Sequence, residues 1–341
     1  MVDRLTQSLG GDHDIIYKYL ADEVFARQAD EIQRFLLSTA VLPDMTAELC
    51  NALLNIDNAQ ELLEELVRKD LFITQIGAGF RYHDLFSEFL RAKLAQDQPA
   101  FRQVTVKAAN LLRDRARFED AVYLYLGVNA WDEASDLLEE QGNNFYNSGR
   151  ALTLNTWLSQ IPAEELARRP RLLLLQGTIF INDLSNPRQA RTVFERAENE
   201  FQIRRNSDGV AEAQVLRSAV LRMSGKPAEA LALAGQGLNQ LVAHQAAPHK
   251  IAYAMHQSAL ANLMAGHSDT AVANLRQALD YFDDLNDAYK VAQCHHDLAV
   301  CLEKQGNINA AHYHFRQALK TWESLGNAND LANTLNSLGV S

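Results

Sequence analysis

A regular pattern of small and large apolar positions runs through the second half of the chain. Four segments align on one alanine: NPRQARTVFERAENE, GKPAEALALAGQGLN, GHSDTAVANLRQALD and GNINAAHYHFRQALK. The aligned alanines stand 40, 41 and 40 residues apart, at Ala190, Ala230, Ala271 and Ala311. Four positions later come Phe194, Ala234, Leu275 and Phe315, and seven positions later come Ala197, Gly237, Ala278 and Ala318. This spacing predicts one apolar face of a helix in each segment.

A small residue precedes each aligned alanine by five positions and predicts a tight turn. These turn residues are Ser185, Gly225, Gly266 and Gly306. The stretches before the turns are also amphipathic, as in KIAYAMHQSALANLMAG and VAQCHHDLAVCLEKQG. The pattern therefore predicts helical hairpins of about 40 residues, which resemble tetratricopeptide repeats with longer helices than the standard 34-residue unit. One hairpin cannot bury its own apolar face, so we expect neighbours to stack into a solenoid.

The first 97 residues follow a different pattern. Apolar residues at helical spacing predict helices over 14–28, 30–42, 45–56 and 59–70. The segment LFITQIGAGFRYH reads as two short strands around Gly77-Ala78-Gly79, and LFSEFLRAKLAQ reads as a final helix. Helices followed by a small hairpin and a last helix are typical of a winged-helix domain.

The expected fold class is all-α, an α-α superhelix of tetratricopeptide-like hairpins preceded by a small winged-helix domain. We expect a winged-helix arm over 1–97, irregular helical repeats that link it to the solenoid over 98–170, and tetratricopeptide-like repeats over 171–341. A further repeat starts near Asn327 and stops at Ser341, so we expect the last repeat to be truncated and the chain to be a piece of a longer protein.

Composition and charge narrow the function classes. The 341 residues carry a formal net charge of −11, which argues against a general nucleic-acid binder, because phosphate binding needs a basic face. The three cysteines, Cys50, Cys294 and Cys301, are too sparse for a disulfide framework and are typical of reduced thiols in the cytoplasm. No apolar run approaches the roughly 20 residues of a membrane span, and no signal-peptide core is present. We expect a cytoplasmic protein without membrane contact.

Both regions together resemble the large STAND-class regulators of the MalT-like and LuxR type. The segments 19–54, 62–76 and 81–94 resemble their winged-helix part, and 130–142, 151–177 and the 40-residue hairpins resemble their sensor part. The resemblance implies that an ATPase module precedes the winged helix, that the repeats bind an inducer or a protein, and that a DNA-binding domain often closes the chain. No G-x4-G-K-[ST] motif occurs here, so ATP or ADP is implied for the parent protein only, and no cofactor for this chain.

The stretch FRYHDLFSEFLRAKL, residues 80–94, gathers polar groups that resemble a catalytic cluster. The family resemblance instead implies that His83, at the start of the last winged-helix helix, faces the nucleotide of the parent protein. In the alternative interpretation, His83 and Tyr82 pack or cap this helix and Asp84 favours its positive N-terminal end. Catalysis is not expected, since neither a nucleophile nor a set of metal ligands accompanies the cluster.

In tetratricopeptide-like solenoids the helices before the turns line a concave face. Counting back from the turn residues gives equivalent inward positions, which we take as candidates for a ligand or peptide groove: Glu212, Arg222, Tyr253, His256, Gln293, His296, Glu303, Asn333 and Asn336. His256 and His296 stand 40 residues apart in one register and are expected to be neighbours across the groove. The alternatives are a solvated face without a ligand and a zinc site at His256, His295 and His296, which the divergence of adjacent helical residues disfavours.

Three classes of function remain. The leading hypothesis is a binding module: the arm and sensor of a STAND-class regulator, with a small-molecule inducer, a peptide or a protein in the groove and the ATPase domain of the parent as a further partner. The alternative is a free-standing scaffold for protein–protein interaction. An enzyme is the least supported class. We do not expect direct nucleic-acid binding, because the last winged-helix helix mixes Asp84 and Glu88 with Arg81, Arg91 and Lys93.

Overall fold

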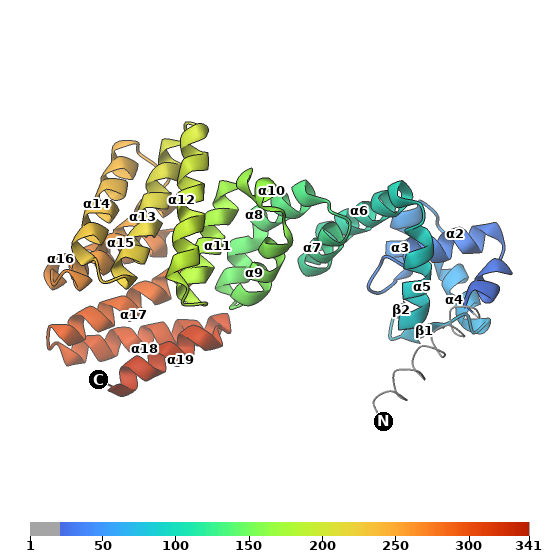
Figure 1. Ribbon diagram of the computed structural model, residues 1–341. Coiled ribbons are helices and arrows are strands. Elements are labelled where there is room, and N and C mark those ends of the chain that lie inside the picture. Colours follow the sequence, from blue (N-terminus) through green and yellow to red (C-terminus); the bar gives the residue numbers. More distant parts are fainter. Residues whose placement is uncertain (1–20, 341) are drawn as a thin grey trace, which may run out of the picture. The chain divides into compact units, whose positions relative to one another are not determined.

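The structure, a computed structural model, describes residues 21–340 and is almost entirely helical there. It divides into two compact units, Met1–Ala134 and Ser135–Ser341 (Figure 1). The first expected helix, 14–28, lies partly outside the described residues, within which residues 21–26 are helical.

The first unit contains the expected winged helix. Its elements are α2 (Asp30–Thr39), α3 (Ala47–Leu54), α4 (Ala59–Arg68), β1 (Ile73–Ile76), β2 (Gly79–Tyr82) and α5 (Asp84–Leu94). The two strands pair antiparallel, with Ile73 opposite Tyr82. Met45 forms an isolated antiparallel bridge with Phe80 of β2. Its backbone N–H donates to Phe80 O at 2.9 Å, and its carbonyl oxygen accepts from Phe80 N at 2.7 Å.

An aromatic cluster fills the core of this winged helix. Phe86 of α5 is fully buried, and its ring centroid lies 5.1 Å from that of Phe72 and 5.8 Å from that of Tyr82. The Tyr82 hydroxyl is hydrogen-bonded to the buried Thr39 hydroxyl at 2.7 Å, and Thr39 also donates to Phe35 O at 2.7 Å. Both apolar and polar contacts therefore hold strand β2 in place against the helices.

Two further helices, α6 (Gln98–Asp114) and α7 (Phe118–Gly127), pack onto the winged helix. Lys107 of α6 donates to Leu53 O at 2.5 Å. Arg117 donates to both carboxylate oxygens of Asp44 at 2.7 and 3.0 Å and also pairs with Asp120. These contacts explain why the first unit extends to Ala134, whereas the sequence placed boundaries at residues 97 and 170.

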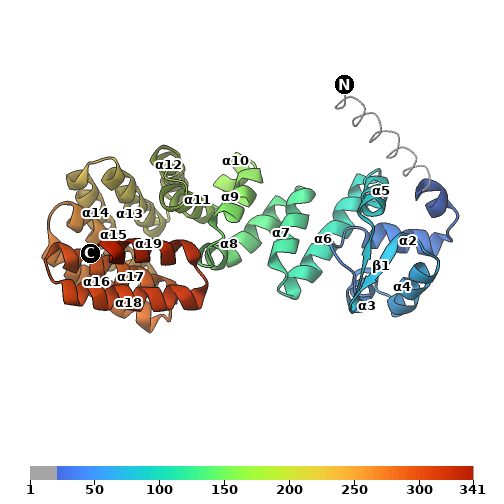
Figure 2. The same ribbon diagram turned by 90° about the horizontal axis from the view of Figure 1, so that it is seen from below.

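The second unit is a superhelix of paired helices (Figures 1 and 2). Its elements are α8 (Trp131–Asn147), which begins just before the division, α9 (Ala151–Gln160), α10 (Ala163–Ala167), α11 (Pro170–Asn182), α12 (Pro187–Ile203), α13 (Ser207–Met223), α14 (Pro227–Ala243), α15 (Pro248–Met264), α16 (Ser268–Asp284), α17 (Ala288–Lys304), α18 (Ile308–Leu325) and α19 (Ala328–Val340). The predicted all-α class, with tetratricopeptide-like hairpins after a winged helix, is confirmed.

The repeat pattern sets the packing of each hairpin. Ser185, Gly225, Gly266 and Gly306 all have positive φ, at 47°, 71°, 85° and 79°, as the tight turns require. The aligned alanines are fully buried. At Gly237 of α14, a Cβ atom would lie 2.6 Å from a methyl of Val215 and 2.8 Å from Ala211 O, so only glycine allows α13 to approach so closely.

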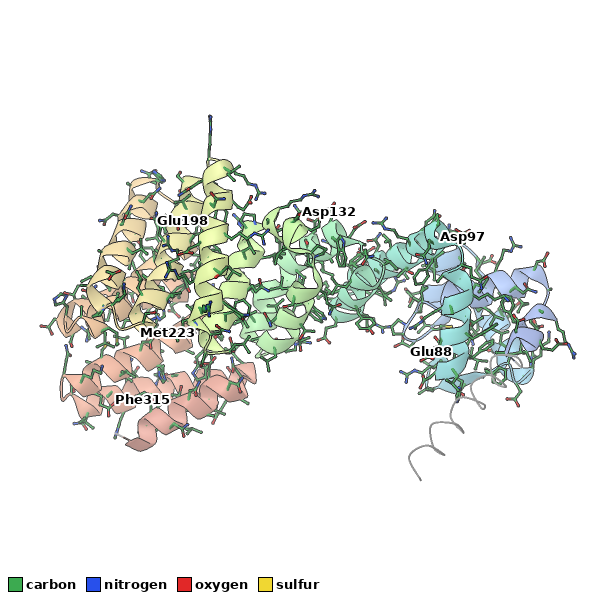
Figure 3. All side chains as sticks on the ribbon, in the orientation of Figure 1. Glu88, Asp97, Asp132, Glu198, Met223 and Phe315 are labelled. Atoms are coloured by element: carbon green, nitrogen blue, oxygen red, sulfur yellow. The ribbon has the colours of Figure 1, made fainter. Side chains whose placement is uncertain are left out.

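Polar contacts also join neighbouring helices. Glu198 of α12, which is labelled in Figure 3, accepts a hydrogen bond from Arg217 of α13, and Gln214 donates to the same carboxylate at 3.2 Å. Phe315 of α18, labelled in the same view, is fully buried against α17. The hairpins are therefore joined by an apolar core with an ion pair at its edge.

The superhelix curves until its later helices lie beside its earlier ones. In Figures 1 and 2, α17–α19 (red) run next to α8 and α11 (green). The rings of Tyr146 on α8 and Tyr289 on α17 lie 6.0 Å apart, and the Trp322 ring lies 5.0 Å from that of Tyr289. These contacts close the curve around a concave space.

The three cysteines are reduced and buried, as their sparse distribution predicts. Burial raises the pKa of the Cys50 thiol to about 12 and that of Cys301 to about 11, and it also raises the pKa of Cys294. All three therefore stay protonated at neutral pH and act as packing residues. Among residues 21–340, no helix combines the length and apolarity that a bilayer crossing requires.

Candidate ligand-binding groove

The concave side of the second unit holds a groove with a cavity volume of about 860 Å3. The first helix of each hairpin, α11, α13, α15 and α17, contributes to its wall, and α8, the start of α9, Phe194 of α12 and α19 complete it. Six carboxamide side chains line it, namely Asn182, Gln257, Gln293, Asn327, Asn329 and Asn333. Its volume lies in the upper part of the range that small-molecule sites occupy, about 300–1,000 Å3.

A buried histidine–carboxylate pair stands at the base of the groove. His256 of α15 is only 3% exposed, and its Nε2 lies 2.6 Å from the Asp297 carboxylate of α17. Burial alone would raise the pKa of Asp297, but the hydrogen bond from His256 and the nearby charges of His256, His296 and Arg222 outweigh it and lower that pKa. Asp297 therefore stays an anion at neutral pH.

Two cations of the groove lack a carboxylate in direct contact. Arg222 of α13 and Lys290 of α17 are half-buried, and neither forms an ion pair within residues 21–340. The Lys290 ammonium lies over the rings of Tyr253 at 4.9 Å and Tyr289 at 5.2 Å and donates to Gln293 at 2.8 Å. Burial lowers the pKa of both side chains; Asp297 opposes this shift at Arg222, and Asp287, with smaller contributions from Asp297 and Asp330, opposes it at Lys290. Their positive charges are thus only partly compensated.

Two carboxylic acids occupy another part of the groove wall. Asp183 at the end of α11 and Asp330 in α19 both line the groove, and burial is the largest cause of the raised pKa of each. Burial, followed by the charge of Asp330, raises the pKa of Asp183 to about 6, although Asp183 keeps access to solvent. Burial also raises the pKa of Asp330, while hydrogen bonds from Tyr289 and Asn327 oppose the shift.

The structure brings together five of the nine residues proposed from the sequence. Arg222, Tyr253, His256, Gln293 and Asn333 line the groove. Their role in binding stays a prediction.

The other four candidates lie outside the groove. Glu212 is ion-paired with Lys250 and lines a second cavity of about 350 Å3. His296 turns toward α19, where its Nδ1 lies 3.0 Å from the Thr334 hydroxyl. The cavity does not extend along the helices as far as Glu303 and Asn336. Counting back from the turn residues therefore predicted the correct helix face. It could not predict how far the cavity extends along the helices.

Several groove residues were missed by the sequence reasoning. Tyr289, Lys290 and Asp297 lie four before, three before and four after Gln293, so the same helix face predicts them. Tyr146 and Asp183 lie upstream of the aligned segments, and only the closure of the superhelix brings them to Tyr289 and Asp330. No local pattern could have found them.

The structure gives each histidine of the zinc alternative a different partner. His256 bonds to Asp297 and His296 to Thr334, while His295 Nδ1 lies 2.8 Å from His314 Nδ1. Burial, together with the charge of His314, lowers the pKa of His295 to about 4. Within residues 21–340 no three metal-binding side chains converge. His256 and His296 do not contact each other, but both lie close enough to Asp297 to lower its pKa.

The polar stretch of the winged helix has two distinct roles. Tyr82 is buried and bonded to Thr39, whereas His83 is exposed at the N-cap of α5 and its side chain makes no cap hydrogen bond. Arg91 donates to Ala40 O at 2.6 Å, and Lys93 pairs with Asp22 at 2.6 Å and lies over the Phe25 ring. Two of the three cations of this stretch thus make internal contacts. The nucleotide role of His83 stays a prediction.

Comparison with known proteins shows what the winged helix is similar to. Residues 21–102 match the MalT winged helix domain family. This region is similar to the MalT winged helix. Over 233 residues, 65% of this chain and 25% of the relative, the sequence is 31% identical to the HTH-type transcriptional regulator MalT of Serratia proteamaculans. The chain thus spans about a quarter of the length of that relative, and the expected MalT-like resemblance is confirmed.

A solved structure resembles the fold of nearly the whole chain. It is a Signal Transduction ATPase with Numerous Domains (STAND) protein with a tetratricopeptide repeat sensor from Pyrococcus horikoshii, with a TM-score of 0.55 and 14% identity. The match covers 93% of this chain and 54% of that protein. At this identity the comparison establishes the fold, in which helical repeats accompany the MalT-like winged helix.

Proposed function

We propose that this chain is the arm and sensor module of a STAND-class, ATP-dependent transcriptional regulator. The MalT-like winged helix over 21–102, the identity with a MalT regulator and the fold shared with a STAND protein support this proposal. In it, the superhelix senses a ligand and the winged helix transmits the signal to an ATPase module of the parent protein. The module acts in the cytoplasm, without catalysis of its own and without direct contact to nucleic acid.

The observation that carries the sensing role is the groove with its partly compensated charges. A cavity of about 860 Å3 holds two cations without direct ion pairs and two acids whose pKa values are raised by burial. Charges left in this state cost stability, and a ligand with complementary groups restores it. A ligand bound by several helices at once would also favour one curvature of the superhelix over another. That preference is the differential affinity that a population shift requires.

The parent protein supplies the nucleotide in this mechanism. His83 is exposed at the start of α5, and an imidazole can donate a hydrogen bond to a phosphate that another domain presents. ATP or ADP would therefore bind outside this chain and contact it through His83.

A thermal-shift screen of this chain against sugars, short peptides, nucleotides and zinc tests the proposal. A ligand at about 100 times its dissociation constant adds about 2.7 kcal/mol to the free energy of unfolding, which raises Tm by several degrees. We expect at least one sugar or peptide to stabilise the wild type but not Arg222→Gln. The matched control is Arg191→Gln on α12, whose side chain is 68% exposed and should leave the shift unchanged.

Other outcomes assign a different role. A shift with ATP would contradict the assignment of the nucleotide site to the parent protein. A shift that survives Arg222→Gln would place the ligand outside the groove. If no compound of the panel raises Tm and the superhelix captures a protein partner, the scaffold for protein–protein interaction would be supported instead.

A further inference from the structure

The charges in the groove are separated by sign. The cations Arg222 and Lys290 share the neighbourhood of Tyr253 and Asp297 on α13, α15 and α17. The acids Asp183 and Asp330 share the neighbourhood of Tyr146, Tyr289 and Asn327 on α8, α11 and α19. One end of the lining therefore carries two cations and one carboxylate, and the other carries two carboxyl groups; Arg150 also lines the groove, but its side chain is exposed and lies over the Phe145 ring at 4.8 Å.

The groups at each end are held in place but not neutralised. At the positive end, Asp297 is the carboxylate that lines the groove, and it already accepts a hydrogen bond from His256, whereas Asp287, whose charge also acts on Lys290, lines the second cavity. At the negative end, tyrosine hydroxyls and Asn327 donate to the two acids, but no cation lies within ion-pair distance of them in the described chain. The charge of Asp330 acts to raise the pKa of Lys290. The Lys290 ammonium, however, is hydrogen-bonded to Gln293 and lies over the rings of Tyr253 and Tyr289.

The carboxamides add a second requirement for the ligand. Asn and Gln side chains offer both donors and acceptors, which is the combination that a peptide unit presents in return. Three of the six, Asn182, Asn329 and Asn333, are exposed to the groove, while Gln257 and Asn327 are buried in hydrogen bonds to His256 and Asp330. The volume of about 860 Å3 exceeds the needs of a single amino acid.

We propose that the groove binds a zwitterion of short-peptide size, with the ligand's carboxylate at Arg222 and Lys290 and its ammonium group at Asp183 and Asp330. This inference rests on the proposed function of the groove as a ligand site. The ligand's two charges would pair with the charged groups at each end of the groove, and its peptide units would meet the exposed carboxamides. Charge-assisted hydrogen bonds at both ends would fix its direction in the site.

Calorimetric titration of the whole chain with trialanine and its blocked forms tests this inference. Acetyl-trialanine lacks the ammonium group, and trialanine amide lacks the carboxylate. We expect trialanine to bind at millimolar concentration and each blocked form to bind about tenfold or more weakly, since each loses one charged hydrogen-bond partner. The free tripeptide binding no better than either blocked form, or producing no heat at all, would overturn the inference.

Variants assign each end of the ligand. Arg222→Gln should abolish the preference for trialanine over its amide and keep the preference over acetyl-trialanine. Asp183→Asn should do the reverse. The controls Arg191→Gln and Asp280→Asn, at exposed positions of α12 and α16, should change neither preference. Binding of a neutral sugar that is lost in Arg222→Gln, with no trialanine binding, would overturn the zwitterion while leaving the proposed sensor role in place.

Discussion

At the scale of single residues, Gly237 shows how one missing side chain sets the distance between two helices. Its α-carbon faces Val215 and Ala211 of α13, where a Cβ atom would meet a methyl at 2.6 Å and a backbone oxygen at 2.8 Å. The backbone oxygen cannot rotate away as a side chain can. Any side chain here must therefore push α14 away from α13.

We expect Gly237→Ala to lower the free energy of unfolding by about 1–3 kcal/mol, the usual cost of overpacking. Gly235, on the same helix, is the matched control, because no atom lies within 4 Å of its would-be Cβ. Gly235→Ala should instead stabilise the chain by up to about 1 kcal/mol through helix propensity. Urea unfolding of the three proteins measures both effects, and equal destabilisation by the two substitutions would contradict the close approach.

Asp183 should make stability depend on pH. Its pKa is about 6 in the folded chain, against an ordinary value of 3.8. Between about pH 4 and pH 6 the folded chain therefore keeps a proton that the unfolded chain has lost, so the free energy of unfolding falls as the pH rises through this window.

Asp183→Asn removes the ionisable group, and we expect it to flatten this fall and to stabilise the chain at pH 7. Urea unfolding at several pH values between about 4 and 7 measures the slope. Asp280→Asn, at an exposed position of α16, should leave the slope as in the wild type. An unchanged slope in Asp183→Asn would mean that the groove does not disfavour this carboxylate.

At the scale of elements, the winged helix depends on one buried polar contact between β2 and α2. The hydroxyl groups of Tyr82 and Thr39 lie 2.7 Å apart, and Thr39 is fully buried. Tyr82→Phe keeps the ring that packs on Phe86 and removes only this hydrogen bond. We expect a loss of about 0.5–1.5 kcal/mol in the free energy of unfolding of the first unit.

Tyr123→Phe is the control for this prediction, since Tyr123 belongs to the same unit and is 71% exposed. The same chemical change there should stay within about 0.5 kcal/mol of the wild type. Chemical denaturation followed by a probe in the first unit would compare them. A larger loss in Tyr123→Phe than in Tyr82→Phe would refute the importance of the buried contact.

Most elements were predictable from the sequence, because their signals are local. The turn residues at Ser185, Gly225, Gly266 and Gly306 and the apolar spacing around the aligned alanines follow from helix geometry alone. The winged helix follows from its order of helices and strands. The extent of the first unit was not predictable, since it depends on contacts such as Arg117 with Asp44, 73 residues apart in the chain.

At the scale of the second unit, the closure of the superhelix decides which residues meet in the groove. Tyr146 and Tyr289 are 143 residues apart in sequence, with ring centroids 6.0 Å apart. A repeat protein in which each hairpin contacts only its neighbours would place them on separate turns. The composition of the negative end of the groove depends on this long-range contact, which explains why the sequence did not predict Tyr146 and Asp183.

A double-mutant cycle on Tyr146→Leu and Tyr289→Leu measures the closure. We expect a coupling of about 0.5–1.5 kcal/mol between the two rings in the free energy of unfolding. The pair Tyr146→Leu and Tyr313→Leu is the control, because Tyr313 is exposed on α18 and its effect should add to that of Tyr146. Additive effects in both pairs would mean that the two ends of the curve are energetically independent.

The buried cysteines have a practical consequence for labelling chemistry. Maleimides and iodoacetamides react with thiolates, and Cys50, Cys294 and Cys301 are both shielded and held in the thiol form. The three native cysteines are therefore expected to react very little with such reagents. A single cysteine introduced at an exposed site in each unit would carry a fluorophore pair without removal of any native residue, and the distance between the dyes would report directly how a ligand moves the sensor relative to the arm.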